Sequence, residues 1–112
     1  MSLLLEEEKY ALSKLFSEHN AFDSAIISYL ADASVLERKY TGIGYFVTIK
    51  FPHDLPNDDG VLARDWNFKH RLLKYGGSFT AFYNKPNVIE LEAVAHDGNW
   101  LDHFNPEDFS DR

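Results

Sequence analysis

The hydrophobic pattern changes its period part-way along the chain, and this change limits the possible folds more than any other feature. In residues 4–16, apolar side chains recur every three or four positions, which is typical of a helix with one buried face. A second helical stripe runs through residues 21–34, and Asn20 is suited to cap its first turn. From residue 43 onward apolar residues occupy alternate positions, as in half-buried strands. The order predicts helices first and strands afterwards.

Two stretches, residues 43–51 and 88–95, show the clearest strand pattern. Every second residue in each is apolar, so one side of each strand should face the core. On the other side of the second stretch, Glu90 and Glu92 lie two residues apart and therefore project from the same face. Residues 35–40 can form a further strand or end the preceding helix.

The remaining strand candidates are shorter and are separated by turn residues. We expect Gly76-Gly77 to end one strand, because paired glycines usually interrupt regular structure. Structural reasons, a bulge or a bend, explain this pair better than a phosphate-binding loop, since no helix is expected after it. The candidates are residues 61–66, 68–75 and 78–83.

We expect one α+β domain over residues 1–112. Helices that precede a run of antiparallel strands pack together on one face of the sheet. We therefore predict an N-terminal helical hairpin packed on one face of an antiparallel sheet of about four to five strands. Residues 1–34 are assigned to the helices and residues 35–96 to the sheet. Residues 97–112 are assigned to an acidic tail that packs on the domain at a few apolar points and frays at its end.

The charge of the chain is strongly acidic, with a formal net charge of −7. The excess is uneven: residues 1–60 carry −5 and residues 86–112 carry −6, whereas residues 61–85 carry +4. These regions can be three ordinary solvated surfaces, or the acids can form a face that attracts a basic partner and speeds its association. The net charge disfavours nucleic acid and anionic membranes, and we predict neither as a partner.

The first residues do not look like a secretory signal. A run of three leucines has no basic residue before it, and three glutamates follow it. The chain contains no cysteine, so it has no disulfide framework and no thiol nucleophile. We expect a cytoplasmic protein.

Motifs for catalysis or metal binding are not found. Nucleophile-elbow, zinc-protease, phosphate-loop and dinucleotide-binding fingerprints do not occur. His96-Asp97 and Asp102-His103 place an imidazole beside a carboxylate, but neither spacing brings three or four ligands together. We predict no metal, no cofactor and no catalytic residues, and we lean against an enzyme.

One block of the sequence resembles a known family. Residues 38–46, Arg-Lys-Tyr-Thr-Gly-Ile-Gly-Tyr-Phe, are similar to an Arg-x-Tyr-Thr-Gly-Val-Gly-Phe-Phe-like block that begins a strand in small uncharacterised bacterial α+β proteins. Residues 76–82 and 89–94 are similar to later strands of that family, although Ala81 stands where a larger aliphatic residue is usual. The resemblance implies an α+β fold and supplies no catalytic residues.

The acid excess and the absence of catalytic motifs favour a binding module that inhibits or regulates a partner protein. Immunity proteins, which cover the basic active site of a nuclease toxin, act in this way. One alternative is a small hydrolase or ligand-binding domain with a pocket between helices and sheet, marked by His96, His103 or the paired glutamates. Another is a homodimeric structural protein. The residues predicted to bind the partner are Asp58, Asp59, Glu90, Glu92, Asp97, Trp100 and Asp102.

Overall fold

The computed structural model describes residues 3–56, 63–84 and 86–112. The described part of the chain contains two α-helices and two single 3-10 turns. The strands form the larger part of the fold. The helical segments are α1 (Glu6–Leu15), α2 (Ala21–Tyr29), η1 (Leu30–Asp32) and η2 (Pro106–Asp108). The strands are β1 (Ser34–Tyr40), β2 (Gly44–Lys50), β3 (Ala63–His70), β4 (Leu73–Asn84), β5 (Val88–Ala95) and β6 (Phe109–Asp111).

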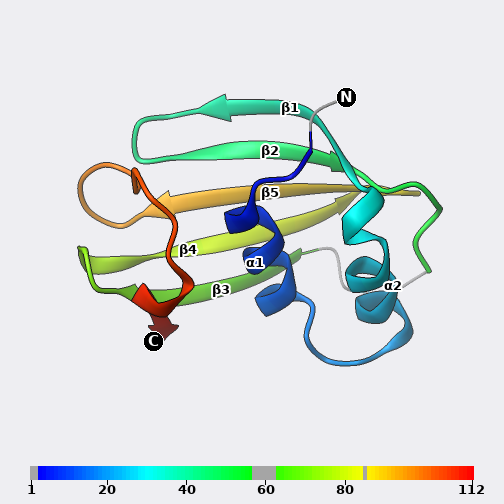
Figure 1. The fold of residues 1–112 in the computed structure, drawn as a ribbon, viewed down its shortest axis with the longest axis horizontal. Coiled ribbons are helices and arrows are strands. Elements are labelled where there is room, and N and C mark those ends of the chain that lie inside the picture. Colours follow the sequence, from blue (N-terminus) through cyan, green and yellow to red (C-terminus); the bar gives the residue numbers. More distant parts are fainter. Residues whose placement is uncertain (1–2, 57–62, 85) are drawn as a thin grey trace.

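All six strands belong to one antiparallel sheet in the order β1-β2-β5-β4-β3-β6. Both helices lie on the same face of this sheet (Figure 1). The α+β class and the N-terminal position of the helices are confirmed, whereas the predicted count of four to five strands is wrong. The longer helix, α1, has ten residues, and no described helix reaches the ~20 apolar residues that a membrane span needs.

The sixth strand comes from the segment that we expected to be an acidic tail with a fraying end. β6 pairs with β3, where Phe109 lies opposite His70 and Asp111 lies opposite Phe68. Phe109 is buried and its ring contacts the ring of Phe68 at a centroid distance of 4.8 Å. This aromatic contact attaches the segment to the core, and a strand of three residues is too short to show alternation.

β4 continues through Gly76-Gly77, where the sequence predicted that a strand would end. A Cβ on Gly77 would lie 2.7 Å from the ring of Phe68 and would overlap the carbonyl oxygen of Val94. Gly76 has φ +69°, a conformation that favours glycine. Gly77 therefore leaves room for the ring of Phe68, and Gly76 adopts the positive φ, while the strand continues through both.

Other boundaries differ by a few residues from those predicted. The helix expected over residues 21–34 ends at Tyr29 and is followed by η1. Residues 35–40, which the sequence allowed to be a strand or the end of the preceding helix, belong to β1. Of the candidate at 61–66, residues 63–66 belong to β3, and residues 61 and 62 lie outside the described residues. The candidate at 68–75 is divided between the end of β3 and the beginning of β4.

Glu8 holds the first turn of α1 against the sheet. Its carboxylate is fully buried and accepts hydrogen bonds from Arg38 Nε and Nη2 on β1, at 2.8 and 2.7 Å. The Leu5 amide also donates to Glu8 Oε1 at 2.8 Å, which closes the N-terminus of the helix. Bidentate guanidinium–carboxylate pairs are short, directional and strong. This pair fixes the position of the neighbouring Glu7 above the sheet.

Candidate functional site

The face of the sheet opposite the helices is open. Alternate residues of β2 and β5 point into the core, where Val47, Ile49, Ile89 and Leu91 are buried. The residues between them point to the other side, which no described element covers (Figure 1). We call this side the open face. An antiparallel sheet can leave one side solvated, but that side is then normally polar.

Two phenylalanines and two glutamates form the centre of the open face. In the register of the sheet, Phe46 on β2 lies opposite Glu92 on β5, and Phe82 on β4 lies opposite Glu90. Both rings are much exposed for residues of their type, at 46% for Phe46 and 42% for Phe82. A depression of about 250 Å³ lies between these side chains. The open face therefore combines apolar rings with negative charge.

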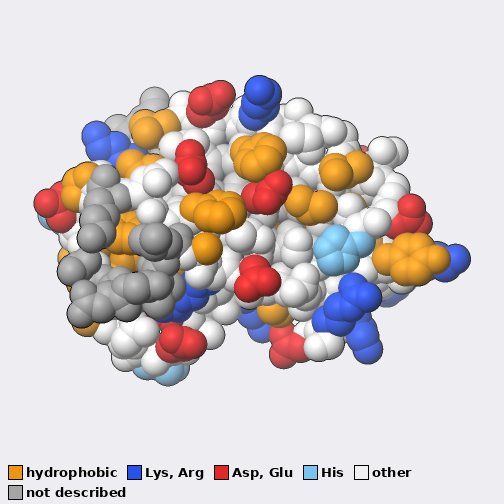
Figure 2. Space-filling view, turned by 180° about the vertical axis from the view of Figure 1, so that it is seen from behind, with side chains coloured by type: hydrophobic (Ala, Val, Ile, Leu, Met, Phe, Trp, Pro, Cys, Tyr) orange, Lys and Arg blue, Asp and Glu red, His pale blue; other side chains and the backbone are white. Residues whose placement is uncertain are grey.

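The two glutamates have no cationic partner in the described part of the chain. Thr48 and Thr80, which flank them on β2 and β4, are uncharged. Figure 2 shows orange and red side chains side by side over the middle of this face, with blue ones nearer its rim. Lys39, which lies opposite Phe46, and Lys50 share this face, but neither forms an ion pair with these glutamates among the described residues. The two carboxylates therefore have no ion pair to give up when a partner binds.

The predicted partner-binding residues do not gather in one place. Asp97 is exposed in the turn after β5. Trp100 and Asp102 lie in the following loop and line a recess on the helix side of the sheet. Only Glu90 and Glu92 lie together on the open face. Asp58 and Asp59 fall outside the described residues.

The recess on the helix side has a volume of about 300 Å³ and contains a buried carboxylate that the sequence analysis did not single out. Glu7 is 8% exposed, and its Oε2 accepts hydrogen bonds from Tyr45 Oη at 2.5 Å and from Trp100 Nε1 at 3.1 Å. Its Oε1 accepts none from the described residues. Three chain segments meet here: the start of α1, the β1–β2 hairpin and the loop after β5.

The burial of Glu7 alters its acid–base chemistry. Loss of water around the carboxylate raises the pKa of Glu7 above its ordinary value, and the negative charge of Glu8 adds to the rise. The hydrogen bonds from Tyr45 and Trp100 favour the charged form but offset only part of this effect. Burial and the charge of Glu7 also raise the pKa of Tyr45, so its hydroxyl remains a donor.

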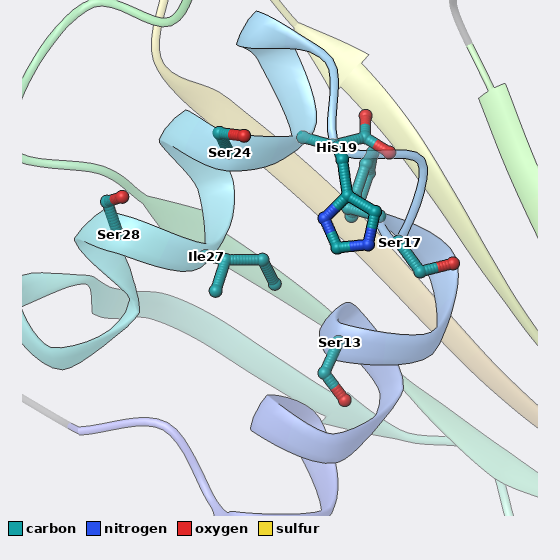
Figure 3. Close-up of a pocket in the computed structure, with 8 residues that line it drawn as sticks. Ser13, Ser17, His19, Ser24, Ile27 and Ser28 are labelled. Carbon is teal, nitrogen blue, oxygen red and sulfur yellow. The ribbon is translucent and has the colours of Figure 1, made fainter.

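A further groove of about 370 Å³ runs between the two helices (Figure 3). Serine hydroxyls from both helices line it, and the imidazole of His19 points into it from the connecting loop. Asp23 also lines this groove, but its Oδ2 accepts from Glu18 N at 2.9 Å and from Arg64 Nη1 at 2.6 Å. No hydrogen bond in the described structure joins His19 to Asp23 or to a serine. A base-activated nucleophile is therefore not assembled in this groove.

The histidines of the two predicted histidine–carboxylate pairs do not lie in a common site. His96 is exposed, and its Nδ1 lies 3.3 Å from the backbone oxygen of Tyr75. His103 lines the recess beside Asp102. Among the described residues, no three His, Asp or Glu side chains converge as metal ligands would.

Strand alternation alone places Phe46 and Phe82 on the outer face, yet the one aromatic residue predicted to bind a partner was Trp100, which lines the recess on the helix side. The signal for Phe46 was present in the alternation of β2. For Glu7 the helical period is a partial signal, because it places residues 7 and 8 on the buried face of α1, but it does not identify the partners of the carboxylate.

Comparisons with known proteins add no relative. No family model, no curated protein and no solved structure matches the chain. The resemblance of residues 38–46 to a bacterial family therefore stays a prediction.

Proposed function

We propose that this protein is a small cytoplasmic binding module that inhibits or regulates a basic partner protein, in the manner of an immunity protein, and that the open face is its binding surface. The observation that supports the proposal most is the pairing of Phe46 and Phe82 with Glu90 and Glu92 on a sheet face that no helix covers. Aromatic side chains are typical anchors at the centre of protein interfaces.

The charge on this face indicates the kind of partner. Glu90 and Glu92 carry no ion pair in the described structure, so a cationic surface gains their attraction without first breaking internal contacts. A partner such as a nuclease toxin, whose active site attracts phosphate, presents a surface of this kind. Covering that site requires complementary charge and no catalytic residue in the inhibitor.

The shape of the face favours a protein over a small molecule. The depression between Phe46 and Phe82 has a volume of about 250 Å³, which is below the ~300–1,000 Å³ that is usual for pockets enclosing small ligands. The alternative of a hydrolase with its pocket at the paired glutamates is therefore less well supported, because these side chains point away from the core.

Affinity capture from the native lysate with charge-matched variants tests the proposal. The tagged wild-type chain should retain a basic protein that is released by moderate salt. The double variant Glu90→Gln and Glu92→Gln should not retain this basic protein. Each lost charge contact is worth about 1 kcal/mol, and the two together correspond to roughly 30-fold weaker binding. The control variant combines Asp32→Asn with Glu107→Gln, which removes the same charge from exposed positions outside the open face.

Three results would contradict the proposal. The captured protein could be acidic, the open-face variant could retain it as well as the control does, or the purified chain could sediment as a dimer that the same variant dissociates. The last result would identify a second copy of this chain as the occupant of the open face.

A further inference from the structure

The recess around Glu7 has features that the open-face function does not use. Its lining residues come from the start of α1, from Tyr40 and Tyr45 beside the β1–β2 turn and from the loop after β5. The β1–β2 hairpin and the loop after β5 lie at the same end of the sheet (Figure 1). Backbone hydrogen bonds from Ala95 N to Ile43 O, at 2.7 Å, and from Trp100 N to Gly42 O, at 3.2 Å, join the loop to the hairpin. The walls of the recess are therefore connected to the sheet and do not depend on a loose segment.

Carboxylates dominate the charge of the recess. Glu6, Glu7 and Asp102 line it, and no lysine or arginine does. Glu6 forms an exposed ion pair with Lys9 at 3.4 Å, whereas Glu7 and Asp102 have no cationic partner in the described structure. The nearby Arg38 is engaged by Glu8 through two hydrogen bonds and does not neutralise the recess.

Aromatic side chains form much of the remaining wall. The rings of Tyr40 and Trp100 both contact the ring of Tyr45, with centroid distances of 5.5 and 6.0 Å. Phe104 lines the recess as well. Aromatic rings attract organic cations through the negative charge of their faces, most strongly where water is partly excluded.

The carboxylate of Glu7 is oriented for a ligand. Tyr45 and Trp100 both donate to Oε2, which fixes the side chain and leaves Oε1 without a donor from the described residues. We propose that the recess binds an organic cation, a primary ammonium or guanidinium group, which donates to Glu7 Oε1 and is surrounded by the aromatic side chains. The volume of about 300 Å³ suits a short chain that ends in such a group, either a free diamine or the end of a lysine or arginine side chain.

Nuclear magnetic resonance of the wild-type chain tests this inference directly, because the indole N–H of Trp100 is bonded to Glu7. Cadaverine, agmatine and N-acetyl-lysine methylamide are each titrated to about 10 mM, ten times the dissociation constant of a weak ~1 mM site. A Trp66→Phe variant assigns the two indole signals. We expect a saturable shift of the Trp100 signal, and none with 1-pentanol, which has a similar length without charge.

The three amines distinguish the possible sources of the cation. A shift with cadaverine or agmatine alone identifies a free amine, and a shift with the blocked lysine as well identifies a site for side chains. Absence of a saturable shift with all three amines, or an equal shift with the alcohol, would overturn the inference. The wild-type titration decides this without any variant.

Glu7→Gln tests the assigned acceptor. Glutamine has the same shape and can still accept from Tyr45 and Trp100, but it offers no negative charge. We expect affinity for the amine to fall by about 10- to 100-fold, the loss of one hydrogen bond to a charged group. Asp32→Asn removes the same charge from an exposed position that lines neither the recess nor the open face, and it should leave the affinity within about twofold, since exposed charges are screened by salt. Unchanged affinity in Glu7→Gln would refute the role of Glu7, and neither result bears on the open face.

Discussion

The folded environment of Glu7 disfavours the charged form of its carboxylate. It is 8% exposed and loses most of the water that would solvate its carboxylate, so the pKa of Glu7 rises above its ordinary value. The folded state therefore binds the Glu7 proton more tightly than the unfolded state does. Protonated Glu7 favours folding below the ordinary value of 4.5, and this contribution is lost as the pH rises through the raised pKa.

Glu7→Gln should therefore make the protein more stable at neutral pH. The glutamine amide stays uncharged, so the difference in free energy of unfolding between variant and wild type should grow as the pH rises from the ordinary value of 4.5 through the raised pKa of Glu7, and level off above it. Urea unfolding of both proteins across this range measures it. Arg38, Glu8, Tyr45, Asp102 and His103 are common to both proteins, so the difference reports on Glu7. A difference that does not depend on pH, or that favours the wild type at pH 7, would contradict the argument.

At the same scale, local pattern predicts some functional residues and misses others. Glu90 and Glu92 share a face because strands alternate, and this follows from their spacing alone. The helical period places Glu7, unlike Glu6, on the buried face of α1, because position 7 lies one turn before Ala11. Its hydrogen-bond partners Tyr45 and Trp100 stand 38 and 93 residues further along the chain, so the sequence near residue 7 does not identify them.

At the scale of elements, β6 has one buried side chain, Phe109, beside its backbone pairing with β3 and the hydrogen bond from Trp66 Nε1 to Asp111. The ring of Phe109 contacts the rings of Tyr10, Phe68 and His70 at centroid distances of 5.3, 4.8 and 4.6 Å. Phe109→Ala should lower the free energy of unfolding by about 3–5 kcal/mol, as is usual for a buried phenylalanine. Urea unfolding measures this loss, and hydrogen exchange should show earlier exposure of the β6 amides than of the β5 amides.

Phe82→Ala is the matched control, because the same atoms are removed from an exposed ring. We expect a change of no more than about 1 kcal/mol in stability, together with weaker binding of the open-face partner. If Phe82→Ala and Phe109→Ala destabilise the protein equally, the open face is part of the folding core and its ring is not reserved for a partner.

The same elements show how far sequence reasoning reaches. β5 was predicted over residues 88–95 because it alternates without interruption, and β2 was predicted within one residue at each end. The strand predicted before Gly76-Gly77 was expected to end there, because glycine pairs are usually turn signals. In the structure β4 continues, and the absence of a side chain at Gly77 makes room for Phe68. β6 depends on a partner strand about forty residues earlier, and such pairing leaves no local trace.

At the scale of the whole molecule, basic residues that are close together in the sequence lie in different places on the folded sheet. The basic segment 61–85 does not form one positive surface, because Arg64 turns inward and pairs with the buried Asp23 at 2.6 Å. Lys69 and Arg71 lie at the far end of the β3–β4 hairpin, away from Glu90 and Glu92. The centre of the open face therefore keeps its negative field, although a basic segment contributes two of the neighbouring strands.

This arrangement predicts how the complex with a basic partner responds to salt. Salt should slow association, since the Debye length falls from about 10 Å at 0.1 M to about 3 Å at 1 M, and should change dissociation much less. Glu90→Gln combined with Glu92→Gln should slow association and flatten its salt dependence. Phe46→Ala combined with Phe82→Ala should instead speed dissociation and leave the salt dependence as it is. Stopped-flow or surface-based kinetics on the captured partner separates the two rates. If both double variants change the same rate in the same way, charge and apolar contact do not have the separate roles that the geometry of the open face assigns to them.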